Sequence, residues 1–306
     1  MRTWSLGVVS FGLLVACSSS SGEGGAAGAP EAGADGGGIL ADGAPAPEGD
    51  AGPAVDARAP GGAVRFTIQL DYRYDTAGFF ADPARKGALE GAARIWGRLL
   101  SDTYPNVPKG TFIKVRDPQK PTEPALSLTI DYEVDDLLVF VGSAELPSGT
   151  TGSSSPTAGL SGITDPTLAA ALQQRFYGPA FQPWTAWITF DASTPFHFDP
   201  DPELGAPVPA GKIDFVSVAL HELGHVLGFG TADAFKKQIV DGRFAGPKTT
   251  ALFGGPLPLT ADQAHVPNAT MSGGTRLLMD SSDAPGTRYL PTLLDQAVLE
   301  DLGHRF

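Results

Sequence analysis

The segment FVSVALHELGHVLGF, residues 215–229, constrains the fold more than any other part of the chain. Most of its residues are apolar, so it predicts a buried helix with Asp214 as the N-cap. His221 and His225 are four residues apart and therefore lie one turn apart on the same face of that helix. Two imidazoles placed in this way can bind one zinc ion through bonds of about 2.0–2.1 Å. Glu222 lies about 100° around the helix, where it can reach a metal-bound water without binding the metal.

A chance match is the alternative, because the pattern HELGH can also arise on a buried helix with two core histidines. The chain contains only five histidines, and two of them fall within this helix. The flanking residues are apolar, as they are around a buried active-site helix. We therefore interpret the segment as part of a metal site that needs a further ligand.

The sequence HELGHVLG, residues 221–228, resembles the active-site helix of metzincin-type zinc metalloproteases, whose longer pattern is HExxHxxGxxH followed by a turn with a methionine. Gly228 matches the glycine at which the chain leaves the helix in that family. Thr231 stands where the short-spaced members have their third ligand, so the resemblance is to leishmanolysin-like members, in which that histidine follows a long insertion. The resemblance implies an α+β fold: a zincin domain with a mixed twisted β-sheet, a long backing helix, the active-site helix and a largely irregular C-terminal subdomain that ends in a helix.

The resemblance implies that His265 is the third ligand and that Met279 is the methionine of the turn. The segment LLMD, residues 277–280, resembles that turn, and a histidine followed by the turn is the order found in the family. A methionine in this position fills space below the site and need not bind the metal. Met271 is the alternative for this methionine.

Four other side chains remain alternatives for the third ligand, and one of them is Asp262. His304 follows Gly303, which predicts a helix stop, and is expected to be exposed at a frayed end. Glu300 is the type of ligand that another class of zinc protease uses, but the sequence around it lacks the motif of that class. Asp233 lies two residues beyond the short spacing.

The rest of the domain alternates between predicted strands and helices. Residues 63–72 are rich in β-branched and aromatic residues and predict a strand. Asp82 followed by proline predicts the start of a helix over 83–101. The other predictions are strands at 111–117, 125–134, 137–144 and 185–193, a surface loop at 145–164, a helix at 164–176 and a last helix near the C-terminus. This order is typical of an α+β domain.

The function that these residues predict is that of a zinc metallopeptidase, an endopeptidase that acts on protein or peptide substrates. Glu222 would be the general base for a metal-activated water. The strand at 185–193 is expected to be the edge strand that binds an extended substrate, and Tyr289 is a candidate donor to the oxyanion. The alternative is a catalytically inactive zincin-fold lipoprotein that acts as a binding or adhesion module, although the retained Glu222 argues against it.

The segment HFDPDPELG, residues 197–205, places Asp199, Asp201 and Glu203 at alternate positions. Such oxygen ligands can bind Ca2+, so calcium is a possible second metal. The segment lacks the glycine placement of an EF-hand loop, and an acidic surface loop is the interpretation that we favour. His197 is expected to be structural or exposed.

The N-terminal part of the chain is predicted to lie outside the folded domain. Residues 1–16 combine Arg2 with a short apolar run, which is typical of a secretory signal peptide and too short to span a bilayer. They continue into Cys17 in the sequence LVAC, which resembles a bacterial lipobox with this cysteine as the lipidated residue. Residues 17–60 are almost entirely Ser, Gly, Ala and Pro and predict a disordered tether. Residues 61–306 then form the catalytic domain.

The number of cysteines and the net charge limit the cellular locations and the binding partners that we expect for this protein. Cys17 is the only cysteine, so an exported chain of this kind cannot form an internal disulfide. The net charge is −13 and there is no cluster of Lys and Arg, which argues against nucleic-acid binding. We expect a monomeric lipoprotein of the outer membrane or cell surface that contacts the membrane through its N-terminal lipid alone. Ser18 after the cysteine is compatible with outer-membrane sorting.

Overall fold

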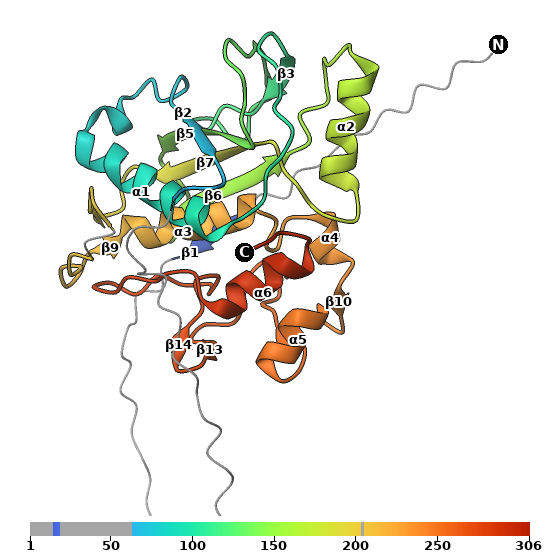
Figure 1. Ribbon diagram of the computed structural model, residues 1–306. Coiled ribbons are helices and arrows are strands. Elements are labelled where there is room, and N and C mark those ends of the chain that lie inside the picture. The colour runs from blue at the N-terminus through green and yellow to red at the C-terminus, as the bar shows by residue number, and fades with distance from the viewer. Residues whose placement is uncertain (1–14, 19–62, 203–204) are drawn as a thin grey trace, which may run out of the picture.

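The computed structural model describes residues 15–18, 63–202 and 205–306, the first of these by its backbone alone (Figure 1). The predicted signal peptide, 1–16, and the predicted tether, 17–60, therefore lie outside the described residues except at Val15–Ser18. The described chain is an α+β structure with a mixed sheet and six helices. None of the helices in this part of the chain is long and apolar enough to span a membrane.

The central sheet has five strands in the order β1-β6-β7-β5-β2. Its members are β1 (Val15–Ser18), β2 (Ile68–Asp71), β5 (Leu137–Ala144), β6 (Thr150–Thr157) and β7 (Thr185–Asp191). Strands β2, β5 and β7 are parallel, whereas β6 pairs antiparallel with β7, and β1 pairs antiparallel with β6. Every residue of β7 and all but the last of β5 are buried, as is typical of central strands covered on both faces.

Helices α1 (Pro83–Leu99) and α3 (Phe215–Val226) pack against each other and cover one face of the sheet. Asp82 caps α1 by accepting hydrogen bonds from the first-turn amides, and proline follows at the first helical position. The contact between the helices includes one buried hydrogen bond, in which Nε1 of Trp96 donates to the carbonyl of Leu220 at 2.9 Å. This contact fixes α3 against the long helix behind it.

The opposite face of the sheet is covered by a hairpin and a helix. The hairpin consists of β3 (Phe112–Val115) and β4 (Leu126–Thr129), and the helix is α2 (Pro166–Tyr177). With alternate residues of β5 and β7 they form a second hydrophobic core, which includes Trp184 and Trp187. Both faces of the central strands are therefore closed, and an added strand can reach the sheet only at its edges.

The chain after α3 lies on the other side of this helix from the sheet and is largely irregular (Figure 1). Its helices are α4 (Asp233–Lys236), α5 (Pro247–Phe253) and α6 (Leu293–Asp301). Its two-residue strands are β10 (Ile239–Val240), β11 (Arg243–Phe244), β12 (Leu257–Pro258), β13 (Met271–Ser272) and β14 (Thr275–Arg276). Three short elements precede α3: a 3-10 turn at Phe79–Ala81 and the strands β8 (Phe196–His197) and β9 (Ile213–Asp214).

Two predictions about the edge of the sheet are wrong. Residues 145–164, predicted as a surface loop, contain β6, and the side chains from Thr151 to Pro156 are buried. The sequence gives no signal for this strand because its residues are mainly Thr, Ser and Gly, without alternation of apolar and polar side chains. The predicted edge strand, 185–193, contains β7, which lies between β5 and β6 and is not an edge.

The prediction that His304 is exposed is also wrong. Gly303, with a φ of 103°, turns the chain back against the core instead of letting it fray. His304 is 3% exposed, and its Nε2 donates to the carbonyl of Leu227 at 2.7 Å. Its Nδ1 lies 3.2 Å from the hydroxyl of Tyr104 and 3.4 Å from Oδ2 of Asp102. The C-terminal segment therefore holds the residue at which α3 ends.

We expect His304→Ala to lower the free energy of unfolding by about 2–4 kcal/mol, because it leaves the carboxylate of Asp102 buried without its imidazole partner. Arg305 offers a matched control, since its exposed guanidinium binds the same carboxylate at 3.0 Å. Arg305→Ala should cost less than about 1 kcal/mol. Urea denaturation of the full chain measures both effects. Equal losses of unfolding free energy in the two variants would show that the buried contacts of His304 stabilise the fold no more than the exposed ion pair of Arg305 does.

Candidate metal centre

Helix α3 carries three of the predicted site residues on an element that is buried along its whole length. Its N-terminus is fixed by Asp214, whose carboxylate accepts hydrogen bonds from the amide and the hydroxyl of Ser217 at 3.0 and 2.7 Å. Arg288 pairs with the same carboxylate at 2.8 Å. The helix therefore presents His221 and His225 from a rigid position.

Three histidine side chains meet beside α3. Nε2 of His221 lies 3.0 Å from Nε2 of His225, which in turn lies 3.1 Å from Nε2 of His265. The third histidine comes from a loop 40 positions further along the chain, and all three rings are buried. Within the described residues, these three form the only group of three or more His, Cys, Asp or Glu side chains that could hold a metal ion.

The second ring nitrogen of each helix histidine is occupied by a backbone carbonyl. Nδ1 of His221 donates to the carbonyl of Leu278, and Nδ1 of His225 donates to the carbonyl of Phe229, both at 2.8 Å. A carbonyl can only accept, so the proton lies on Nδ1 and Nε2 carries a lone pair. Two such lone pairs repel each other at this distance unless a cation lies between them. Nitrogens bound tetrahedrally to zinc would lie about 3.3 Å apart, so the donor set fits such a metal.

Burial keeps these imidazoles neutral. It lowers the pKa of His221 to about 3, and the neighbouring His265 adds to this effect. Burial and the two neighbouring histidines likewise lower the pKa of His225 well below its ordinary value. Neutral imidazole is the form that binds a metal, so near neutral pH these two ligands need not lose a proton.

Asp262 orients the third histidine. Its Oδ2 lies 2.8 Å from Nδ1 of His265, while its Oδ1 accepts hydrogen bonds from the hydroxyl of Thr260 and the amide of Ala264. Burial alone would raise the pKa of Asp262, but these hydrogen bonds, led by that from His265, hold it below its ordinary value. A carboxylate behind a metal-binding histidine fixes the ring and increases its basicity. Asp262, an alternative for the third ligand in the sequence, thus lies behind His265 and outside the histidine cluster.

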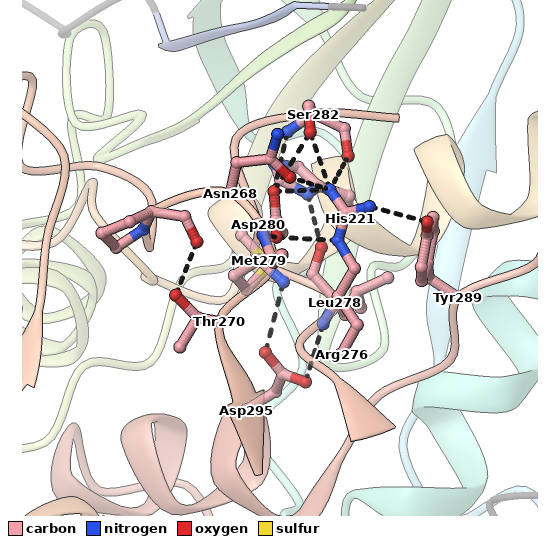
Figure 2. Close-up of polar contacts among 12 residues, drawn as sticks. His221, Asn268, Thr270, Arg276, Leu278, Met279, Asp280, Ser282, Tyr289 and Asp295 are labelled. Atoms are coloured by element: carbon pink, nitrogen blue, oxygen red, sulfur yellow. Dashed lines mark hydrogen bonds and ion pairs between the residues drawn. The ribbon is translucent and has the colours of Figure 1, made fainter. Parts of the chain in front are cut away.

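Met279 lies directly against α3. It is buried, and a Cβ added at Gly224 would meet its sulfur at 2.5 Å. Figure 2 shows that the turn is held by Asp295, whose two carboxylate oxygens accept hydrogen bonds from the amides of Leu278 and Met279 at 3.1 and 3.2 Å. The alternative methionine, Met271, is 50% exposed and does not belong to this core.

Two glycines allow the chain to leave α3 and pass close to the loop of the third histidine. Gly228, the predicted exit glycine, has a φ of 114°, which a residue with a side chain rarely adopts. Gly230, which no motif in the sequence marks, has a φ of 71°. A Cβ added there would lie 2.5 Å from the backbone oxygen of Ala264, the residue before His265.

Glu222 lies beside the strand β6. Its side chain is fully buried, and a Cβ added at Gly152 would meet its Oε1 at 2.6 Å. Its backbone carbonyl accepts a hydrogen bond from the hydroxyl of Ser154 at 3.0 Å. The strand therefore runs directly along the predicted general base. Tyr289, the candidate oxyanion donor, accepts a hydrogen bond from Arg276 at 2.8 Å (Figure 2).

Thr231, which stands in place of the short-spaced ligand, and the alternative ligands Glu300 and Asp233 make other contacts. The hydroxyl of Thr231 donates to the carbonyl of His225 at 2.6 Å and so caps the end of α3. Glu300 pairs with Lys248 at 3.0 Å, and Asp233 is exposed in the first turn of α4.

No protein-family model and no curated protein matches the sequence, so the assignment of the site rests on geometry.

The acidic segment considered for calcium takes part in an ion pair. Asp199 is buried, and its Oδ2 lies 2.8 Å from the guanidinium of Arg288. Asp201 is exposed, and His197 is half-buried in β8. Glu203 lies outside the described residues. One of the three carboxylates is therefore used to hold Arg288 next to the start of α3.

We expect the wild-type chain to bind one zinc ion and His265→Ala to lose it, because the two histidines of the helix are an incomplete ligand set. His197→Ala is the matched control, since His197 lies outside the histidine cluster. The metal content of the dialysed proteins, measured by mass spectrometry, checks this. Zinc retained by His265→Ala would show that the third ligand is another residue.

Proposed function

We propose that the protein is a zinc-dependent endopeptidase of the metzincin-like type with leishmanolysin-like spacing of its third ligand. The observation that carries the proposal is the convergence of the Nε2 atoms of three histidines, at distances of 3.0 and 3.1 Å. Two of these histidines share α3 with a buried glutamate. His221, His225 and His265 would hold the metal, with Met279 packed against the helix. The mixed sheet covered by α1 and α3 is compatible with a zincin domain.

Glu222 would move the proton in this reaction. A zinc ion bound to the three histidines would supply a polarised water near neutral pH and a Lewis acid for the peptide carbonyl. The carboxylate of Glu222 would accept a proton from the attacking water and pass it to the nitrogen of the leaving amine. Because Glu222 directly follows His221, it is offset by about 100° around the helix and does not compete for the metal.

An extended peptide substrate would bind by adding a strand to β6. In the structure β1 makes such an addition, in antiparallel register with Cys17 opposite Gly152. The backbone of β6 can therefore hydrogen-bond an added strand directly beside Glu222. A substrate would replace β1 at this edge. Cleavage before Cys17, which the lipobox predicts, would remove Val15 and Ala16, half of β1.

Glu222→Gln should lower kcat/KM for labelled casein by about 10²–10⁴-fold, because an amide cannot take up the proton of the attacking water. The zinc content should stay that of the wild type, since Glu222 is not a ligand. Glu300→Gln is the control and should retain activity, because its carboxylate pairs with Lys248 outside the site. A zinc-loaded wild type that cleaves no peptide would instead favour a binding lipoprotein without catalysis.

We also propose that the protein is exported and lipidated at Cys17, which would anchor the domain at the outer membrane or cell surface. The support is the sequence LVAC and the absence of any other cysteine. Cys17→Ser should abolish incorporation of radioactive palmitate in a Gram-negative host, because the thiol is the acylated group. Ser20→Ala, in the same segment, should leave incorporation unchanged. Palmitate bound to Cys17→Ser would contradict the proposal.

A further inference from the structure

Asp283 is a half-buried carboxyl group that the proposed reaction does not use. It lies four residues after Met279 and contacts β6, the strand that β1 covers in the structure: the hydroxyl of Thr151 donates to its Oδ2 at 2.8 Å. Thr151 precedes Gly152, the residue that lies against Glu222. Asp283 therefore contacts the strand residue next to the one that lies against the predicted general base.

The charge of this carboxylate is not balanced by an ion pair within the described residues. Its hydrogen bond comes from the neutral hydroxyl of Thr151. The positive charge of Arg276 acts on it, but this guanidinium donates its hydrogen bonds to other groups, as Figure 2 shows. Its acceptors are Asn268, Asp280, Ser282 and Tyr289.

The surroundings of Asp283 favour an additional positive charge. Burial raises the pKa of this carboxyl to about 6, although the hydrogen bond from Thr151 and the charge of Arg276 act in the opposite direction. The charges of Asp280 and Asp214 add to the increase. The protein alone therefore stabilises the ionised form poorly, and a cation from a ligand would form a charge-assisted hydrogen bond with it.

We propose that Asp283 is a specificity-determining residue that binds a lysine or arginine side chain of the peptide substrate. The inference rests on the proposed endopeptidase function and on peptide addition at β6. A strand added there runs past Thr151, which brings a side chain next to the scissile bond within reach of Asp283. A basic side chain would pair with the carboxylate, and an acidic one would be repelled.

A purely structural role for Asp283 makes a different prediction. The hydrogen bond from Thr151 joins the segment after the methionine turn to the edge of the sheet, so its loss could loosen the site. Such loosening would lower the activity on all peptides alike. Recognition of a charge instead changes the ratio of the kcat/KM values of peptides that differ in charge alone. This ratio is therefore the quantity to measure.

The experiment uses the zinc-loaded full chain and peptides that carry Lys, norleucine or Glu at one position within two residues of the scissile bond. We expect the wild type to cleave the Lys peptide with a kcat/KM at least about tenfold above that of the norleucine peptide. Asp283→Asn should bring this ratio close to one, and Asp283→Lys should favour the Glu peptide. Asp233→Asn, which changes an exposed aspartate on α4, should keep the wild-type ratio.

A wild-type ratio close to one, a ratio that Asp283→Asn leaves unchanged, or an equal loss on all three peptides would overturn the proposal. Binding to Glu222→Gln separates this outcome from a failure of the proposed function. By fluorescence anisotropy, Glu222→Gln should bind the Lys peptide at least about tenfold more tightly than the norleucine peptide, and adding Asp283→Asn should remove the difference. If Glu222→Gln shows this preference in binding but the wild type cleaves no peptide, the result would support the subsite and contradict the proposed endopeptidase function. Equal binding of both peptides would refute the subsite whatever the activity.

Discussion

The hydrogen bonds made by the Nδ1 atoms of the three histidines are the interactions on which the candidate site depends. Burying an imidazole costs free energy unless its polar atoms find partners. Here the partners come from three segments: the carbonyl of Leu278 in the methionine turn, the carbonyl of Phe229 after α3, and the carboxylate of Asp262 in the loop of His265. Each ring is thereby oriented with Nε2 toward its neighbours. The irregular C-terminal region is thus the part of the fold that arranges the ligand atoms.

In that region, aspartate side chains accept hydrogen bonds from backbone amides that regular secondary structure would otherwise satisfy. Asp295 accepts hydrogen bonds from two amides of the methionine turn, and Asp301 accepts them from the amides of Lys248 and Thr249. Asp280 accepts one from the amide of Ala269. A chain with few helices and strands still has to satisfy its buried amides, and a carboxylate can serve two of them at once. Part of the acidic excess of the sequence therefore has a structural use and is not evidence for a cationic partner.

Local patterns in the sequence predicted the α+β class and several elements, whereas contacts between distant segments were out of reach. The strand at 137–144 was predicted with the bounds that it has, because it is apolar throughout. The two histidines and the glutamate of α3 could be placed on one helix by periodicity alone. The strand at 150–157 could not be predicted, because its burial depends on neighbours and its residues are mainly Thr, Ser and Gly. The positions of Asp262 and His304 likewise depend on what the loop and the C-terminal segment pack against.

The contact between His304 and the end of α3 also has a consequence for the order of events during synthesis. Leu227 is translated 77 positions before the histidine that binds its carbonyl. Asp295, which holds the turn below α3, is likewise translated after every one of the three clustered histidines. A nascent chain that has reached only residue 265 has all three imidazoles but still lacks the carbonyl of Leu278, which orients His221. Complete assembly of the cluster thus awaits the synthesis of the segment that contains Leu278 and Asp295.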